Sequence, residues 1–249
     1  MAEHDRVLAA LRADPDVLGV VLVGSRAIGA PIEQPSSDWD LRVIVRDAAY
    51  AGAVARLATP HGAPVEVAVM RLTTFERMTE PASPLAWDRP SYLHARIELD
   101  RLDGRVEALV GLCASLSPSE AHSRAAHELD GYINAYFRSI KNAAIGLGLA
   151  SRLDAAESIG PLLTALFAIH DRVRPFNRHL ELELERRPLG GGWLAAPVLL
   201  PRLERIVATG ELARQAALFR DVERLARRND LADVIESWEP DVPRLREGA

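Results

Sequence analysis

The chain has 249 residues, of which 48% are hydrophobic and 26% charged, with a formal net charge of −5. This composition is ordinary for a soluble globular protein with one large domain or two small ones. The negative charge argues against a nucleic-acid partner, the lone Cys113 excludes an internal disulfide and a cysteine-based zinc site, and no apolar run approaches the ~20 residues that span a bilayer. The polar start MAEHDR carries no secretory pattern, so the expected location is cytoplasmic.

Helical and strand periodicities alternate over the first hundred residues. Val7, Leu8 and Leu11 have helical spacing, and the apolar run that follows them ends at Gly24-Ser25. The elements predicted in this half are a helix over 3–13, a strand over 18–24, a strand that opens at Asp38, a helix over 48–58, and strands over 64–70 and 92–100.

Asp38 and Asp40 open the second predicted strand. Side chains alternate along a strand, so both carboxylates point to one face, roughly 6.5 Å apart along the chain. Unpaired carboxylates repel each other and lose solvation, which a bound cation usually resolves. Oxygen ligands alone favour a hard ion, and the pair therefore predicts Mg²⁺ or Mn²⁺. The alternative is an Asp-rich turn whose carboxylates are solvated.

The end of the first strand supplies groups that could bind the phosphates of a nucleotide. Gly24 lets backbone N–H groups approach an anion, the Ser25 hydroxyl can donate to a phosphate oxygen, and a helical turn from Arg26 aims its N-terminus the same way. Gly24, Ser25 and Arg26 are the predicted nucleotide-binding residues of this segment. Together with the carboxylates they indicate a nucleotide–metal site.

The pattern Gly24-Ser25-x-Ala27-x-Gly29, a loop, and then Asp38-x-Asp40 resembles the signature of the DNA polymerase β-like nucleotidyltransferase superfamily. Its short form is most similar to the bacterial branch that holds minimal, aminoglycoside and lincosamide nucleotidyltransferases. The resemblance implies an α+β chain. Residues 1–116 would form a nucleotidyltransferase domain, a mixed β-sheet with flanking helices, and residues 117–249 an all-α helical-bundle domain.

Glu66 is out of character in the apolar strand PVEVAVM, because a carboxylate between Val65 and Val67 is costly unless it is paired or holds a metal. In the resembled superfamily, a third acid on the strand after the D-x-D strand often completes the site. Glu66 would share a metal with Asp38 and Asp40, act as general base, or do both. The alternative is an outward-facing glutamate on an edge strand.

Ser117-Pro118-Ser119-Glu120 is a strong helix start, with Ser at N-cap, Pro at N1 and Glu at N3. From there to the C-terminus the periodicity is helical without strand signals, which marks the predicted domain boundary. A second helix is expected to begin at Asp154 or Glu157, and the tail from Pro240 is expected to be loose.

The first long helix of this half carries a polar stripe that includes Asp130, Arg138 and Lys141. In related nucleotidyltransferases a helix in this place supplies a Lys to the phosphates. By that resemblance Arg138 and Lys141 would neutralise a triphosphate and Ser139 would add a hydroxyl contact, whereas the alternative is a solvated face. The position where the aminoglycoside enzymes place a base carboxylate is Phe137, so the base role would fall to Glu66 or to Asp130.

The predicted activity is metal-dependent transfer of a nucleoside monophosphate, with ATP as the expected donor, to a hydroxyl of a small-molecule acceptor such as an aminoglycoside-like antibiotic. The alternatives are an antitoxin-type enzyme that modifies a protein tyrosine with AMP, and a nucleotide-binding module without turnover. No membrane partner is expected. The apolar helices offer enough surface for a homodimer.

Overall fold

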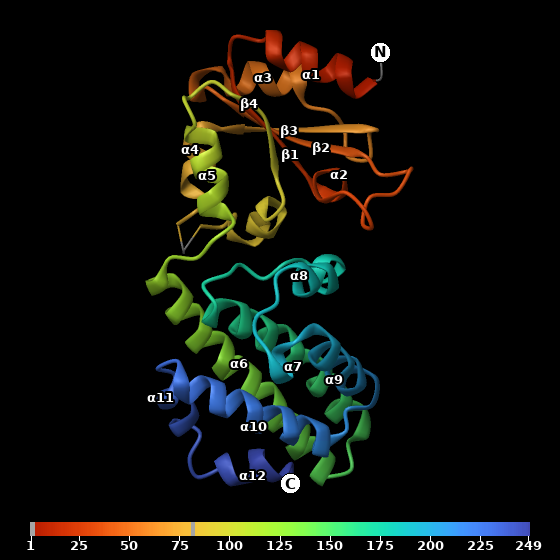
Figure 1. Ribbon diagram of the computed structural model, residues 1–249, viewed down its shortest axis with the longest axis vertical. Helices are drawn as coiled ribbons and strands as arrows, with labels where there is room; N and C mark the ends of the chain where they lie inside the picture. The colour runs from red at the N-terminus through yellow and green to blue at the C-terminus, as the bar shows by residue number, and fades with distance from the viewer. Residues whose placement is uncertain (1–2, 81–82) are drawn as a thin grey trace. The chain divides into compact units, whose positions relative to one another are not determined.

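The computed structural model describes residues 3–80 and 83–249, and the chain divides into two compact units, Met1–Ser115 and Leu116–Ala249. A mixed four-stranded sheet lies in the N-terminal unit, and the described C-terminal unit is helical (Figure 1). The predicted α+β fold class is confirmed. None of the helices in the described ranges is long and apolar enough to cross a bilayer.

The sheet of the N-terminal unit has the strand order β3-β2-β1-β4. Strand β1 pairs antiparallel with β2 and β4, and β2 pairs parallel with β3. The elements of this unit are α1 (Glu3–Ala13), β1 (Val17–Val23), α2 (Gly24–Ile28), β2 (Trp39–Val45), α3 (Tyr50–Leu57), β3 (Val65–Arg71), α4 (Leu72–Arg77), β4 (Arg96–Asp100) and α5 (Arg105–Cys113), with 3₁₀ helices at Asp47–Ala49 and Ala86–Tyr92.

Helices cover both faces of the sheet (Figure 1). Leu8 and Leu11 of α1 pack with Leu41 of β2 on one face, together with α3. On the other face, α4, α5 and the 3₁₀ helix Ala86–Tyr92 pack around Ile44 of β2. Asp40 has the same strand parity as Ile44, so the carboxylate pair belongs to the α4/α5 face.

The strand predicted over 92–100 is shorter than expected, because its first residues follow a 3₁₀ helix that buries Tyr92 at 1% exposure. Arg89, in the same 3₁₀ helix, is 2% exposed and lies at the C-terminal end of α5. Its Nε donates to the carbonyl of Cys113 at 3.0 Å, and its Nη2 donates to the carbonyl of Leu112 at 3.2 Å. A guanidinium can satisfy several of the carbonyls that a helix end leaves without partners.

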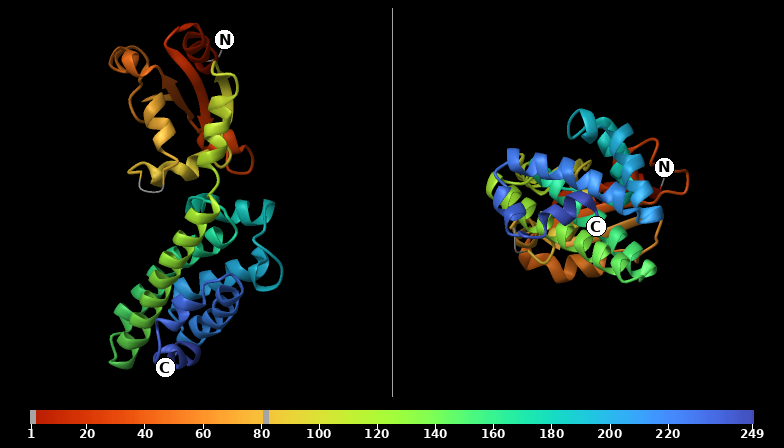
Figure 2. Two further views of the ribbon diagram at one scale, coloured as in Figure 1. Left: turned by 90° about the vertical axis from the view of Figure 1, so that its left-hand side faces the viewer. Right: turned by 90° about the horizontal axis from the view of Figure 1, so that it is seen from below.

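The C-terminal unit is built around the long pair α6 and α7, which lie side by side in both views (Figures 1 and 2). Ser117 caps α6 as predicted, since its hydroxyl accepts from the Glu120 N–H at 3.3 Å. The elements are α6 (Pro118–Ala144), α7 (Gly148–Ile169), α8 (Leu180–Arg186), α9 (Ala196–Thr209), α10 (Leu212–Arg228), α11 (Ala232–Glu236) and α12 (Val242–Glu247), with 3₁₀ helices at Asn177–His179 and Gly192–Leu194.

Two expectations for this unit were wrong. Helix α7 begins at Gly148 rather than at Asp154 or Glu157, because the chain re-enters a helix directly after the Gly146 turn. The tail after Pro240 is not loose: it forms α12, whose Leu245 is fully buried and accepts a hydrogen bond from Tyr136 at 2.9 Å. So short a helix gives little periodicity to detect, and long-range packing holds it.

Gly19 of β1 provides a test of the packing between the sheet and α5. A Cβ at this position would lie 2.7 Å from a methyl group of Val106. We expect Gly19→Ala to lower the free energy of unfolding by about 1–3 kcal/mol through overpacking, measured by urea denaturation.

Gly111→Ala is the matched control, because a Cβ there meets nothing within 4 Å and Gly111 is on α5 itself. Alanine at this exposed helical position should stabilise by about 0.5–1 kcal/mol. Equal effects of the two substitutions would contradict the described contact between Gly19 and Val106.

Candidate active site

Three carboxylates meet where β1, β2 and β3 lie next to one another. Asp40 pairs with Val23 on one side and with Glu66 on the other, so Glu66 lies beside Asp40 across the sheet. Asp38 precedes β2 with the same side-chain parity. Asp38, Asp40 and Glu66 each offer an oxygen, and these oxygens lie within 4.8 Å of one another.

Burial raises the pKa of Asp40 above its ordinary value of 3.8, and the negative charge of Asp38 raises it further, with a smaller contribution from Glu66. The carboxylates of Asp38 and Asp40 form no hydrogen bond or ion pair with a residue that the structure describes. Two half-buried carboxylates thus repel each other, and the nearby positive charge of Arg42 offsets this repulsion only in part. A cation is the partner that would relieve this repulsion.

Glu66 is held differently. One carboxylate oxygen accepts from the Gly62 N–H at 3.2 Å and contacts Nδ1 of His61 at 2.8 Å, and the side chain is 19% exposed. Burial acts to raise the pKa of Glu66, but the hydrogen bonds from Gly62 and His61 outweigh it and hold that pKa below its ordinary value of 4.5. Glu66 is therefore a fixed anion, better suited to bind a cation than to accept a proton.

Gly24 begins α2 against the Asp40 side chain. Its φ is +73°, and a Cβ here would lie 2.2 Å from Oδ2 of Asp40, so only glycine fits without displacing the carboxylate. Ser25 follows, 8% exposed, and its hydroxyl forms no hydrogen bond within the described ranges. Gly24 therefore lies against the carboxylate cluster and Ser25 follows it in the chain, while phosphate binding by this turn stays a prediction.

Arg26 is engaged by the loop that leads to Asp38. Its Nε and Nη2 donate to the Ser37 carbonyl at 3.0 and 2.7 Å, its Nη1 pairs with Glu33 at 2.5 Å, and its guanidinium lies 4.9 Å from the centre of the Trp39 ring. Arg26 thus ties α2 to the residue directly before Asp38. In this arrangement it positions a carboxylate rather than offering a free cation to a phosphate.

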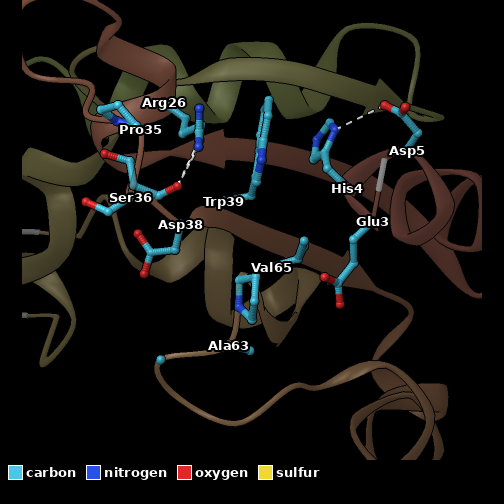
Figure 3. A pocket seen from close by; sticks show the side chains of 13 residues that line it. Glu3, His4, Asp5, Arg26, Pro35, Ser36, Asp38, Trp39, Ala63 and Val65 are labelled. Atoms are coloured by element: carbon cyan, nitrogen blue, oxygen red, sulfur yellow. Dashed lines mark hydrogen bonds and ion pairs between the residues drawn. The ribbon is translucent and has the colours of Figure 1, made fainter. Parts of the chain in front are cut away.

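A pocket of about 640 Å³ adjoins the cluster and shares Asp38 with it. Figure 3 shows Trp39 between Arg26 and His4, and the His4 ring is stacked on it with a centroid distance of 3.6 Å. Both faces of the indole are thereby occupied. The remaining lining is mixed. Carboxylates of α1 and the serines that precede Asp38 are polar, whereas Pro35, Pro64 and Val65 are apolar.

Arg42 is a residue that the sequence reasoning missed. It lies two positions after Asp40 on the same strand face, 3.8 Å from the Asp88 carboxylate, and its positive charge acts to lower the pKa of both Asp40 and Glu66. The signal was present in the alternation of β2, where an arginine interrupts the apolar run LRVIV. Without the carboxylates from the neighbouring strand, that interruption gave no reason to assign Arg42 to the site.

The predicted residues of the C-terminal unit have partners within that unit. Ser139 is fully buried and donates to the Ser151 carbonyl at 2.9 Å, which leaves no hydroxyl for a phosphate. Arg138 pairs with Asp154 at 3.1 Å and with Glu157 at 2.9 Å. Lys141 lies 5.6 Å from the centre of the Phe137 ring, and Asp130 accepts a hydrogen bond from the Trp238 indole at 2.9 Å.

The carboxylate cluster fits a hard divalent cation. Its donors are all oxygen, they come from three positions around one point, and two of them lack any partner among the described residues. Mg²⁺ and Mn²⁺ favour such donors, whereas zinc prefers nitrogen and sulfur. Asp38, Asp40 and Glu66 are thus the residues that would hold the ion.

Among solved structures, the chain is similar to a nucleotidyltransferase-like protein from Exiguobacterium sibiricum. The TM-score is 0.46, the sequence identity is 13%, and the match covers 97% of this chain and 76% of that one. No protein-family model matches the sequence, and no match was found among curated proteins. The function of this chain is therefore inferred from its own side chains.

The raised pKa of Asp40 predicts a pH-dependent effect of Asp40→Asn on the metal-free protein. As the pH rises above 3.8, the Asp40 carboxyl loses its proton in the unfolded chain before it does so in the folded chain. Ionisation of Asp40 therefore lowers the free energy of unfolding at pH values above 3.8. We expect Asp40→Asn to raise the Tm at pH 7 in the presence of a chelator, and the gain to vanish as the pH falls toward 3.8.

Asp47→Asn is a control for which we expect the opposite change in Tm. The hydroxyl of Thr73 donates to the Asp47 carboxylate and lowers its pKa, so this group stabilises the fold above 3.8 and its loss should lower the Tm at pH 7. Thermal unfolding followed by circular dichroism between pH 3.8 and pH 7 measures the Tm changes of both variants. A loss of stability in Asp40→Asn at neutral pH would show that the carboxylate is already compensated.

Proposed function

We propose that residues 1–116 form the catalytic domain of a metal-dependent nucleotidyltransferase that transfers AMP from ATP to a hydroxyl of a small-molecule acceptor. The observation that supports it most strongly is the meeting of Asp38, Asp40 and Glu66 beside the Gly24-Ser25 turn. A divalent cation held by these carboxylates would lie next to backbone and hydroxyl groups suited to phosphate oxygens.

Each residue has a physical role in the proposed reaction. Gly24 allows the backbone to approach the phosphates closely, and the free Ser25 hydroxyl donates to a phosphate oxygen. Asp38, Asp40 and Glu66 would hold a cation, which would neutralise charge on the triphosphate and lower the pKa of the acceptor hydroxyl. Arg42 adds a fixed positive charge on the same sheet face as Asp40.

The transfer forms a bond between the acceptor oxygen and the α-phosphorus and breaks the bond from that phosphorus to the bridging oxygen. Pyrophosphate leaves with the bonding electron pair, and a carboxylate of the cluster takes the hydroxyl proton. The pocket beside Asp38 supports a small acceptor, because about 640 Å³ is within the usual range for small-molecule sites.

We expect calorimetry to detect Mg²⁺-dependent binding of ATP at micromolar strength to the wild type, and binding at least ~10-fold weaker in Asp38→Asn/Asp40→Asn, because the ion loses two ligands. Glu107→Gln, which removes an exposed carboxylate from α5, should bind like the wild type. Absence of triphosphate binding by the wild type with either Mg²⁺ or Mn²⁺ would overturn the proposal.

Pyrophosphate release with a panel of hydroxyl acceptors then tests the transfer itself. If a proteomic search finds AMP-modified tyrosines and no small acceptor gives pyrophosphate release, the acceptor is a protein. Binding without release on either kind of acceptor would indicate a nucleotide-binding module.

Arg42→Ala tests the role of the Arg42 guanidinium, which lies on the same sheet face as Asp40. Loss of a charge-assisted contact to phosphate should weaken ATP binding about 10-fold, and Arg42→Lys should recover part of it. Asp88→Asn is the control, because it breaks the 3.8 Å ion pair but keeps the Arg42 charge. Weakening by Asp88→Asn equal to that by Arg42→Ala would assign Arg42 a structural role only.

A further inference from the structure

A second cavity lies wholly within the helical unit and is lined mainly by residues of α7, α8 and α9. Its volume is about 970 Å³, which is the size of a site for a drug-sized molecule. The proposed nucleotidyl transfer makes no use of this cavity, so the ligand of the cavity is inferred independently of that reaction.

The floor of this α7–α9 groove is apolar. Leu163 of α7 and Leu203 of α9 are 2% and 5% exposed, and Val207 of α9 lies beside them with 52% of its surface open to solvent. Leu180 of α8 and Leu200 of α9 complete the floor. An apolar body that covers these side chains would gain free energy in proportion to the area removed from water.

The charged groups that line the groove are mostly acidic. Glu181 of α8 and Glu204 of α9 have no hydrogen-bond or ion-pair partner among the described residues, and Glu157 of α7 pairs with Arg138. Arg174 is the basic residue in the lining. Its Nη1 donates to the Gly160 carbonyl at 2.9 Å and its Nη2 to the Asn177 side chain at 2.5 Å, whereas its buried Nε has no hydrogen-bond partner among the described residues.

We propose that the α7–α9 groove binds an organic cation with an apolar body, such as an alkyl or aryl amine, whose hydrocarbon lies on the Leu163–Leu203 floor and whose ammonium group lies between Glu181 and Glu204. A carboxylate ligand would meet two uncompensated negative charges there. A polyhydroxylated polyamine would have to leave its hydroxyl groups against an apolar floor, where they find no hydrogen-bond partners.

Calorimetry of the full chain with n-butyl-, n-hexyl- and n-octylammonium tests the two parts of the site separately. Contact with the floor predicts that affinity rises about threefold to fourfold for each added CH₂ group. Attraction to surface carboxylates alone predicts affinity that is independent of chain length. Octanoate and kanamycin should bind more weakly than octylammonium.

Two sets of variants locate the binding. Glu181→Gln/Glu204→Gln should weaken octylammonium about fivefold and leave octan-1-ol unchanged, because only the charge is removed. Val207→Lys should abolish the chain-length dependence. Val198→Lys is the matched control, since Val198 is also on α9, is 44% exposed and does not line the groove.

Circular dichroism and the Tm of each variant establish that it folds. We expect both lysine variants to fold, because Val207 and Val198 are exposed. An affinity that does not grow with chain length, or an equal loss in Val207→Lys and Val198→Lys, would overturn the inference. ATP binding measured on the same samples keeps the two proposals apart, because the groove variants leave Asp38, Asp40 and Glu66 untouched.

Discussion

The pairing register of three strands is the constraint on which the candidate active site depends. Asp40 faces Val23 on one side and Glu66 on the other, and this register gathers three carboxylates and the Gly24 turn at one point. A shift of one residue would turn the carboxylates toward the α1/α3 face. The apolar cores on both sheet faces hold the register, and their burial offsets the repulsion between the like charges.

Three arginines have specific roles in the N-terminal unit, and two of them act on the carboxylate cluster or on the loop that leads to it. Arg26 fastens the loop before Asp38, Arg42 contributes positive charge on the Asp40 face, and Arg89 closes the end of α5. Guanidinium suits these tasks because its planar array of donors can satisfy several carbonyls or a carboxylate at once. Arg26 thereby fixes the segment that leads to Asp38 through contacts within the chain.

The helical unit has a chemistry of its own. Ser139, Arg138 and Asp130 are engaged in contacts inside this unit, so the nucleotidyltransferase proposal draws its support from the N-terminal carboxylates and the Gly24-Ser25 turn. The α7–α9 groove instead combines an apolar floor with two carboxylates that have no partner in the described chain. Such a combination selects ligands by hydrocarbon length and positive charge together.

The sequence by itself determined the features that depend on a few neighbouring residues. The shared face of Asp38 and Asp40 and the Ser117 cap of α6 follow from local periodicity and capping chemistry, and the α+β class was implied by the resemblance that the Gly24-Ser25 and Asp38-x-Asp40 pattern carries. The tertiary structure decided which distant residues join them. Pairing of β2 with β3 brings Glu66 to Asp40, which the sequence indicated only through the family resemblance. The Ser37 carbonyl engages Arg26, and Tyr136 anchors the tail helix α12, which the sequence did not indicate. These contacts depend on register and packing between segments far apart in the chain, which local spacing does not encode.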